Sequence, residues 1–222
     1  NVTSIDLNEN CKVKHIIMQK NKENKNLFVT TYTNCKKNSR YEQTTFNFSD
    51  GFVRNCHYTD LNESFSSVNY NGVFFLKNAN SSENKTFVCH KSESCTSDQN
   101  YKGVLNDTAK GIYNSFTIVD KNAKNTEGYQ LSKGILLSDN STFFSKPELR
   151  INTDDVKCSH GSTIGPLDDQ LIYYIRSRGI GKKQAINLLV KSFVEENILK
   201  INNLKVQHKI ENYMNKYLSE IN

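Results

Sequence analysis

Residues 116–119 read Phe-Thr-Ile-Val, and the polar sequence Asp-Lys-Asn follows at once at 120–122. A short run of aromatic and β-branched residues that ends in turn-forming residues is typical of a β-strand. Similar runs recur along the chain before Pro166 at a spacing of roughly eight to twelve residues. Examples are 13–18, 27–33, 44–48, 72–76, 86–89, 142–144 and 149–151. The chain before Pro166 is therefore predicted to be all-β.

The apolar residues of several runs alternate with period two, as Phe46 does with Phe48 and Phe116 with Ile118. This alternation predicts strands with one buried and one solvated face. It leaves a sandwich, a barrel and a coiled solenoid open as architectures. No sequence repeat of fixed period is evident, which argues against the solenoid. From pattern alone, the sandwich is slightly favoured.

After Pro166 the apolar period lengthens to that of a helix. Asp168 is placed as the N-cap of a first helix, and Gly179 is expected to end it. A second helix is expected at about 182–199 and a third at about 204–218. The residues predicted to form their apolar faces are Leu171, Ile172, Tyr174 and Ile175 in the first, Ala185, Leu188, Leu189, Ser192 and Phe193 in the second, and Val206, Ile210, Tyr213, Met214 and Tyr217 in the third. Three helices are thus expected in the last part of the sequence, after Pro166.

The charge of the 222 residues excludes some partners. There are 29 Lys and Arg against 23 Asp and Glu, which gives a net charge of +6. The excess is spread evenly, with +3 before Asp168 and +3 from Asp168 onward, so we expect no nucleic-acid-binding face.

No apolar run approaches the ~18 residues of a membrane span, and the first residues contain no basic and apolar leader. We therefore expect a soluble chain that binds neither nucleic acid nor membrane.

The six cysteines stand at 11, 35, 56, 89, 95 and 158 and form no Cys-x-x-Cys pair. Asn-x-Ser/Thr triplets at 1, 47, 62, 80, 84, 106 and 140 leave open a secreted, glycosylated, β-rich surface or adhesion domain. Asn is so abundant that such triplets arise by chance, and a 25.4 kDa chain can hold a core without disulfides. We therefore expect reduced thiols.

Motifs of several enzyme classes are missing from the sequence. There is no phosphate-binding Gly-x-x-x-x-Gly-Lys-Ser/Thr, no Gly-x-Gly-x-x-Gly, no His-Glu-x-x-His and no Gly-x-Ser-x-Gly. Polysaccharide hydrolysis of the pectin-cleaving kind would need a carboxylate cluster that the sequence does not show in register. These absences argue against those enzyme classes, and the sequence shows no activated nucleophile.

Three histidines lie beside cysteines, and one pair has the spacing of ligands. Adjacent residues on a strand face opposite sides, so Cys56-His57 and Cys89-His90 do not suit one metal ion. Cys158 and His160 are two residues apart and would face the same side of an extended segment, as ligands for iron or zinc. Two ligands do not complete a coordination sphere, so such a site needs ligands from another chain or inorganic sulfide. The alternative is a buried Cys158 that acts as a small apolar residue and a His160 bonded to backbone in a turn.

The residues around this pair resemble a known family. The string Asp-Asp-Val-Lys-Cys-Ser-His-Gly-Ser-Thr at 154–163, with Leu-Asp-Asp at 167–169 and Tyr-Ile-Arg-Ser-Arg-Gly-Ile at 174–180, resembles the C-terminal signature of the SufB/SufD family of iron-sulfur assembly proteins. Further matching strings lie upstream, at 101–107, 111–114, 136–139 and 146–149, and more faintly at 52–55. Ser159 and Gly161 flank the histidine where B-type members typically carry acidic residues, so the chain resembles the D-type members.

This resemblance implies a mainly β fold: a right-handed parallel β-helix core domain at 1–166, followed by a small helical domain at 167–222 that docks the ATPase SufC. It replaces the sandwich favoured by pattern alone. The open end of the β-helix is expected to pair with SufB, which caps the exposed edge strands. A homodimer is possible when the chain is alone. The helical N-terminal domain of full-length family members has no counterpart in these residues.

The resemblance also implies a function and its residues. The chain would be a non-catalytic scaffold, with ATP hydrolysis in SufC. His160 would be a ligand of a nascent, transient iron-sulfur cluster at the SufB interface, and Cys158 a neighbour of less defined role. The isolated chain would bind no cofactor tightly. Tyr173, Tyr174, Arg176 and Arg178 are expected to contact SufC. The density of Asn and Lys suggests an AT-rich genome, and therefore a plastid-type stroma such as an apicoplast, or otherwise a bacterial cytoplasm.

Overall fold

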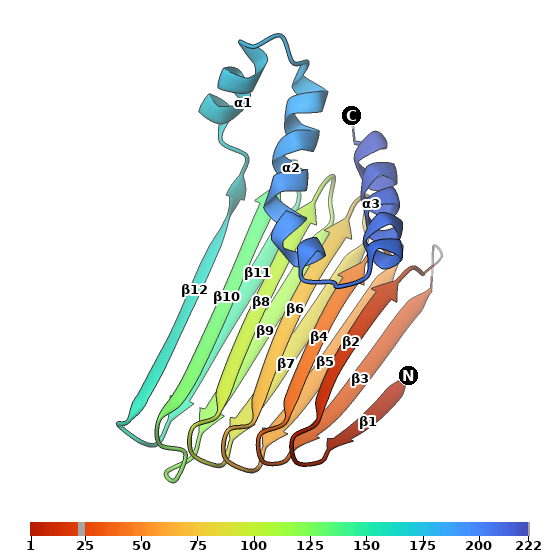
Figure 1. Ribbon diagram of the computed structural model, residues 1–222. Helices are drawn as coiled ribbons and strands as arrows, with labels where there is room; N and C mark the ends of the chain where they lie inside the picture. Colours follow the sequence, from red (N-terminus) through yellow and green to blue (C-terminus); the bar gives the residue numbers. More distant parts are fainter. Residues whose placement is uncertain (22–24, 222) are drawn as a thin grey trace.

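A computed structural model of the chain describes residues 1–21 and 25–221. In this part of the chain, strands fill the first three quarters and helices follow (Figure 1). The strands are β1 (Val2–Leu7), β2 (Lys12–Gln19), β3 (Asn26–Cys35), β4 (Arg40–Asn47), β5 (Phe52–Leu61), β6 (Ser67–Leu76), β7 (Ser81–His90), β8 (Thr96–Leu105), β9 (Lys110–Val119), β10 (Thr126–Leu136), β11 (Thr142–Ile151) and β12 (Val156–Pro166). The helices are α1 (Asp169–Arg176), α2 (Lys182–Leu199) and α3 (Leu204–Ser219).

The strands form a parallel β-helix. Odd-numbered strands make one six-stranded sheet in the order β1-β3-β5-β7-β9-β11, and even-numbered strands make a second in the order β12-β10-β8-β6-β4-β2. All the strand pairs are parallel, because the chain returns to the same sheet after each coil and runs beside the strand it left there (Figure 1). The β-helix implied by the resemblance is confirmed, and the sandwich favoured by pattern alone is wrong.

The missing sequence repeat has a simple cause. The number of residues in a coil varies. The register partners along the even-numbered sheet are His15, Gln43, Tyr70, Gln99, Gln130 and His160, and successive partners lie 28, 27, 29, 31 and 30 residues apart. The turns absorb this variation while the strands stay in register. A fixed period is therefore not needed to build this solenoid.

Asparagine shapes many of the turns between strands. Asn10, Asn38, Asn78 and Asn125 have positive φ angles of 61°, 53°, 54° and 54°. Asn is one of the few side chains that adopt this left-handed conformation at low cost. Turns also stack from coil to coil, as where Asn38 Nδ2 donates to Asn10 Oδ1 at 2.6 Å. The abundance of Asn thus has a structural use here.

The space between the two sheets is partly polar. Its apolar cluster includes Tyr41, Tyr70, Phe74 and Tyr101, yet side chains such as Gln99 and Thr117 are equally buried. On β9 the inward side chains are Tyr113, Ser115, Thr117 and Val119, whereas Phe116 and Ile118 lie half-buried on the outer face. The prediction that Phe116 and Ile118 face the core was wrong. These side chains instead pack against neighbours on the outer face, as Phe116 does against Phe87 with ring centroids 5.3 Å apart.

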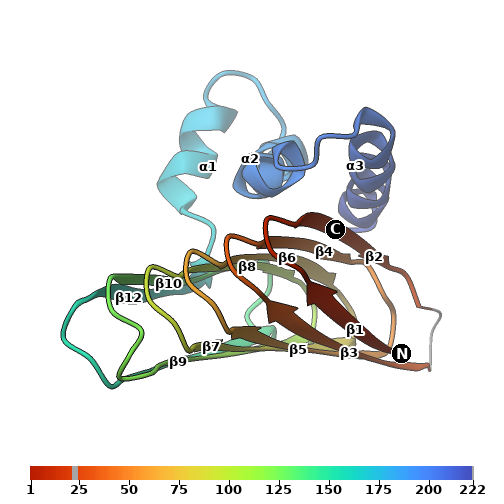
Figure 2. The same ribbon diagram turned by 60° about the horizontal axis from the view of Figure 1, so that its bottom comes forward.

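The helices cover the outer face of the even-numbered sheet and leave the other sheet uncovered (Figure 2). Phe46, Val73, Phe75, Val104 and Ile135 of that sheet form one apolar cluster with residues of α2 and α3. The helix residues in it are Val190, Val194, Ile198, Ile210, Met214, Tyr217 and Leu218. The carboxyl-terminal halves of β4, β6 and β8 are thus buried on both faces, as strands of parallel sheets commonly are.

The predicted helices are confirmed, but the face of α2 is not. Its buried residues are Ala185, Val190, Val194, Asn197 and Ile198. Of the predicted face, Leu188 is 48% exposed, and Ser192 is also exposed. Apolar residues lie on more than one side of this helix, so packing against the sheet decides which side is buried. In α3, by contrast, Ile210, Met214 and Tyr217 are buried as predicted.

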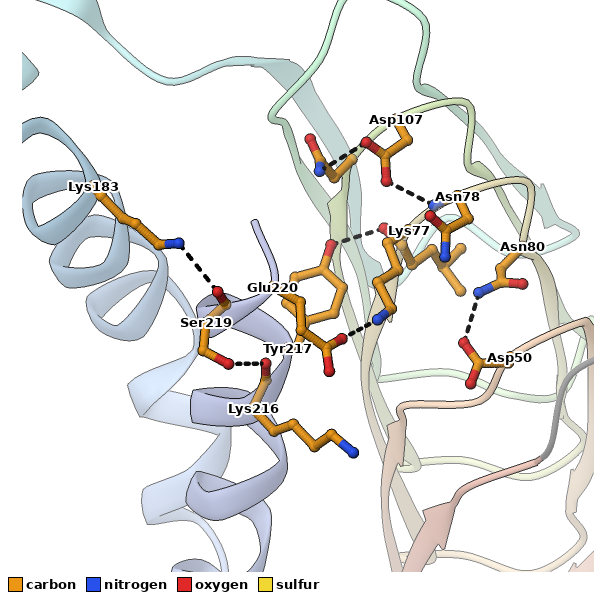
Figure 3. A network of polar contacts seen from close by, with 12 residues as sticks. Asp50, Lys77, Asn78, Asn80, Asp107, Lys183, Lys216, Tyr217, Ser219 and Glu220 are labelled. Carbon is orange, nitrogen blue, oxygen red and sulfur yellow. Dashed lines mark hydrogen bonds and ion pairs between the residues drawn. The ribbon is translucent and has the colours of Figure 1, made fainter. Parts of the chain in front are cut away.

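Polar contacts fix α3 to the turns of the solenoid (Figure 3). The Tyr217 hydroxyl is buried and donates to the main-chain oxygen of Leu76 at 2.7 Å. Beside it Lys77 forms an ion pair with Glu220, and Lys183 of α2 donates to the main-chain oxygen of Ser219 at 3.1 Å. The last helix is thus attached both to the sheet and to α2.

Candidate functional site

β12 is the last rung of the even-numbered sheet, and among the strands of residues 1–21 and 25–221 its only neighbour is β10. Cys158 pairs in register with Gly128, and His160 with Gln130. Gly128 and Gln130 lie on the inner, buried face of β10. The Cys158 and His160 side chains therefore share the inner face of the terminal rung, where the solenoid is open. This is the common orientation that the spacing predicted.

The Cys158 sulfur lies against the preceding rung. A Cβ atom added at Gly128 would be 3.2 Å from Cys158 Sγ, so the glycine leaves room for the sulfur. The side chain is half-buried, and this burial raises the pKa of the thiol, while a hydrogen bond from the Gly128 backbone acts in the opposite direction. The free thiol is thus held mainly in its protonated form near neutral pH.

His160 is exposed at the open end of the solenoid. Its two neighbours in sequence are small, and a Cβ at Gly161 would have only Leu131 Cδ1 within 4 Å, at 3.5 Å. Across the described residues there is no group of three or more His, Cys, Asp or Glu side chains arranged to hold a metal ion. Cys158 and His160 could therefore supply part of a coordination sphere, and further ligands would have to approach from outside the chain.

The other two histidine-cysteine pairs are separated by the strands, as predicted. His57 is fully buried and lies with its ring Nε2 3.0 Å from Gln43 Nε2, whereas Cys56 is half-buried on the outer face. His90 is also fully buried, with Nε2 2.8 Å from Ser97 Oγ. Burial lowers the pKa of His57 to about 3 and that of His90 to about 4. All six cysteines are free thiols.

The residues expected to contact a partner lie on and just after α1, which follows β12 directly. Tyr173 is 74% and Tyr174 54% exposed, and Arg176 and Arg178 are exposed as well. Arg178 donates to the Tyr174 hydroxyl at 2.5 Å and lies 4.8 Å from the centre of its ring. Only Ile172 of the predicted apolar face is buried, so the prediction was wrong for Leu171, which is 43% exposed, and for Tyr174.

A groove between α2 and α3 was not foreseen from the sequence. Its apolar lining consists of Leu188, Ile198, Leu199 and Met214. Leu188 and Leu199 are 48% and 64% exposed. The groove exists because α2 turns Val190 and Val194 to the sheet and its other apolar residues away from it. Helical periodicity alone could not show which side of α2 this would be.

Comparison with known proteins assigns the family. Residues 1–193 match the family model described as "SUF system FeS cluster assembly, SufBD core domain". The chain belongs to the SufBD family. This match covers every strand, together with α1 and most of α2.

Three relatives show where in the SufBD family the chain stands. It is 32% identical to the Escherichia coli iron-sulfur cluster assembly protein SufD over 138 residues, which are 62% of this chain and 33% of that protein. It is 32% identical to the chloroplastic protein ABCI7 of Arabidopsis thaliana over 111 residues, 50% of this chain and 23% of that protein. It is 26% identical to SufD of Plasmodium berghei over 224 residues, 99% of this chain and 17% of that protein. The D-type resemblance is thereby confirmed.

The chain spans about a third of the length of the E. coli SufD and a smaller share of the other two proteins. Within residues 1–21 and 25–221, none of the helices combines the length and hydrophobicity that crossing a bilayer requires.

Proposed function

We propose that this SufBD-family chain is a non-catalytic scaffold subunit whose terminal rung supplies ligands to an iron-sulfur cluster during assembly. The observation that carries the proposal is the shared inward orientation of Cys158 and His160 on β12. The cluster is cargo in this scheme, because the two side chains provide too few ligands to retain it alone. A second subunit supplies the missing ligands and later makes the cluster site accessible.

The edges of β11 and β12 favour SufB as that second subunit. Both strands end their sheets, so their outer backbone N–H and C=O groups have no neighbouring strand in the described chain. Such edges pair readily with another chain. Inward side chains of β11, such as Ser145 and Leu149, are only partly buried at this end. A partner with a similar coil would cover them and place its own ligands beside His160.

The thiol of Cys158 must lose its proton to bind iron, because thiolate is the ligand form. Burial opposes this loss in the free chain. Coordination to a metal ion overcomes that opposition, since metal binding releases the proton of a coordinating thiol. In the proposed scheme Cys158 therefore becomes a ligand only when metal and partner are present together.

The helices are proposed to dock the ATPase SufC, mainly through Tyr173, Tyr174, Arg176 and Arg178. Aromatic and arginine side chains exposed together are typical anchors of protein interfaces. The groove between α2 and α3 offers an adjoining apolar surface. Only Leu167 and Asp168 separate α1 from the strand that carries His160. A force on α1 would thus reach the cluster site through about 20 Å of extended strand.

The family membership gives no support to a secreted, glycosylated surface domain. We propose instead a plastid-type stroma or a bacterial cytoplasm as the compartment, because the relatives include a chloroplastic and a bacterial protein. Without SufB, the same two edge strands could pair two copies of this chain into a homodimer.

Reconstitution tests the function. The full chain is mixed with SufB and SufC, complex size is measured by light scattering, and bound iron and sulfide are counted. His160→Ala should leave the complex assembled and sharply reduce bound cluster. His208→Ala, which removes an exposed imidazole on α3, is the control and should retain cluster. Wild-type cluster yield from His160→Ala would remove His160 from the mechanism, and failure of the wild-type chain to join SufB would contradict the scaffold role.

A further inference from the structure

A row of inward-facing polar residues runs through the solenoid along the even-numbered sheet. Register pairs connect its members from one open end to the other: His15, Gln43, Tyr70, Gln99, Gln130 and His160. Histidines stand at both ends and amides occupy most of the interior positions. Gln130 is the interior member next to His160, so its surroundings bear on the candidate site.

The side chain of Gln130 is held in one orientation. It is only 3% exposed. Its Nε2 donates to Thr117 Oγ1 at 2.8 Å and to the main-chain oxygen of Glu148 at 3.3 Å. A carbonyl oxygen can only accept a hydrogen bond, so the nitrogen end of the amide must face Glu148. The oxygen end is thereby directed away from both of these partners.

That oxygen, Gln130 Oε1, is buried and has no hydrogen-bond partner within the described part of the chain. Leaving such an acceptor unpaired is unfavourable, because it has lost its hydrogen bonds to water. On the preceding rung, Gln99 Nε2 donates to Thr117 Oγ1 at 2.9 Å and makes no bond to Gln130 Oε1. On β12, the Ser162 hydroxyl accepts a hydrogen bond from Ser132 at 3.0 Å. The register partner of Gln130 on β12 is His160, an exposed side chain that carries an N–H donor.

We propose that Gln130 is a positioning residue for His160: its Oε1 accepts the N–H of the imidazole and so selects the ring nitrogen that presents a lone pair at the open end. Adjacent strands lie about 4.8 Å apart, a separation that two side chains of this length bridge easily. The exposed His160 ring reaches the amide by a change of rotamer, which is fast for surface side chains.

This inference rests on the proposed function for its purpose, although the hydrogen bond itself belongs to the chain alone. A neutral imidazole has one N–H and one lone pair, and only the lone pair binds metal. Histidine ligands commonly donate their other N–H to a fixed acceptor, which sets the tautomer and the ring orientation. Gln130 is suited to that role because Thr117 and the Glu148 carbonyl hold its amide in place.

The hydrogen bond is tested by nitrogen NMR of the full chain labelled with 15N-histidine, at a pH where the imidazoles are neutral. The His160 signals are assigned by their loss in His160→Ala. The wild-type chain should show one dominant His160 tautomer. Gln130→Met, which keeps the shape and removes the acceptor, should give a mixture of tautomers. Gln99→Met, which removes an equally buried amide one rung further from His160, should not.

A second variant covers the case in which Gln130→Met does not fold. Gln130→Glu keeps an acceptor at the same place, so His160 should retain one dominant N–H position or become doubly protonated through the new carboxylate. An unchanged tautomer mixture in the wild-type chain and both Gln130 variants would overturn the proposal. So would a tautomer shift of equal size in Gln99→Met.

Cluster loading on the reconstituted complex provides the second measurement. Gln130→Met should lower retained cluster about 10-fold, the size of effect expected from removing a hydrogen-bond partner of a metal ligand, while Gln99→Met should not. If Gln130→Met changes the tautomer but His160→Ala keeps full cluster, the hydrogen bond stands and the proposed function fails. If His160→Ala loses cluster while Gln130→Met leaves the tautomer unchanged, the positioning role fails and the function stands.

Discussion

The ammonium of Lys102 lies 2.8 Å from the main-chain oxygen of Phe193, so a charged side chain of β8 is bonded to the backbone of α2. The Lys102 side chain is only 6% exposed and also lies 3.3 Å from Glu196 Oε2. Burial lowers the pKa of this amine, although the hydrogen bond and charge of Glu196 act in the opposite direction. The sheet and the helix that covers it thus share a buried polar contact beside their apolar cluster.

Lys102→Ala should destabilise the full chain by roughly 2–3 kcal/mol, because it removes a buried aliphatic stem and leaves a cavity. Lys102→Met, which keeps the stem, should cost under about 1 kcal/mol, since a well-packed apolar residue often replaces a buried charge without loss. Urea unfolding measures both. Equal losses in the two variants would show that the charge, and not the stem, is what stabilises the interface.

Gly72→Ala should destabilise the solenoid by about 1–3 kcal/mol through overpacking. The ring of Tyr101, the register partner of Gly72, occupies the space that a Cβ would need. That ring cannot move aside easily, because it stacks on Tyr113 with centroids 4.2 Å apart. Gly165→Ala is the matched control, since a Cβ there has nothing within 4 Å. A loss of stability as large in the control as in Gly72→Ala would contradict this reasoning.

Acid should destabilise the fold through His57. Burial, and to a lesser extent the nearby His15, lowers its pKa from an ordinary 6.5 to about 3. The neutral ring accepts a hydrogen bond from Gln43, which protonation would break. The unfolded chain takes up the proton first as pH falls, so the stabilisation is present above pH 6.5 and is lost between there and pH 3.

The slope in this window should be about 1.4 kcal/mol per pH unit for each such histidine. His90, whose pKa is lowered to about 4, contributes in the same direction. His57→Gln should therefore flatten the pH dependence of the free energy of unfolding without abolishing it. Parallel pH profiles for wild type and variant, from urea unfolding between pH 4 and 7, would show that His57 is not the group responsible.

Tyr173→Ala should weaken binding of SufC about 10-fold or more, as expected when an aromatic anchor is removed from an interface. Its side chain is 74% exposed, so the free energy of unfolding should change by less than about 0.5 kcal/mol. Phe28→Ala, which truncates an aromatic side chain 51% exposed on the uncovered sheet, is the control. Calorimetric titration compares the two, and unchanged SufC affinity in Tyr173→Ala would exclude this tyrosine from the contact.

The start of α1 was predicted because capping is local, and α3 begins with a cap of the same kind. Asp168 Oδ1 accepts the backbone N–H of Gln170 at 2.8 Å, and Asn203 Oδ1 accepts that of Val206 at 3.2 Å. Each bond joins residues two or three apart, so the sequence beside each helix contains the information. The buried face of α2 could not be predicted in the same way, since it depends on contacts with Phe75 and Val104 far away in the sequence.

The strands, like the helices, have some features that the sequence predicts and others that it does not. The short aromatic and β-branched runs lie in β2, β3, β4, β6, β7, β9 and β11, but they did not show that Phe116 faces outward. Hydrophobicity predicts which residues avoid water, and in this solenoid several of them do so by stacking on the outside of the sheet. The interior positions beside Phe116 belong to Ser115 and Thr117, and the Thr117 hydroxyl accepts a hydrogen bond from Gln99 of β8.

By itself, the sequence determined the change from strands to helices near Pro166, the three helical segments and the common orientation of Cys158 and His160, because each depends on residues a few positions apart. The tertiary structure alone decided that His160 lies beside Gln130, 30 residues earlier. That pairing is set by the length of a coil and by backbone hydrogen bonds between rungs, which no local pattern of side chains encodes.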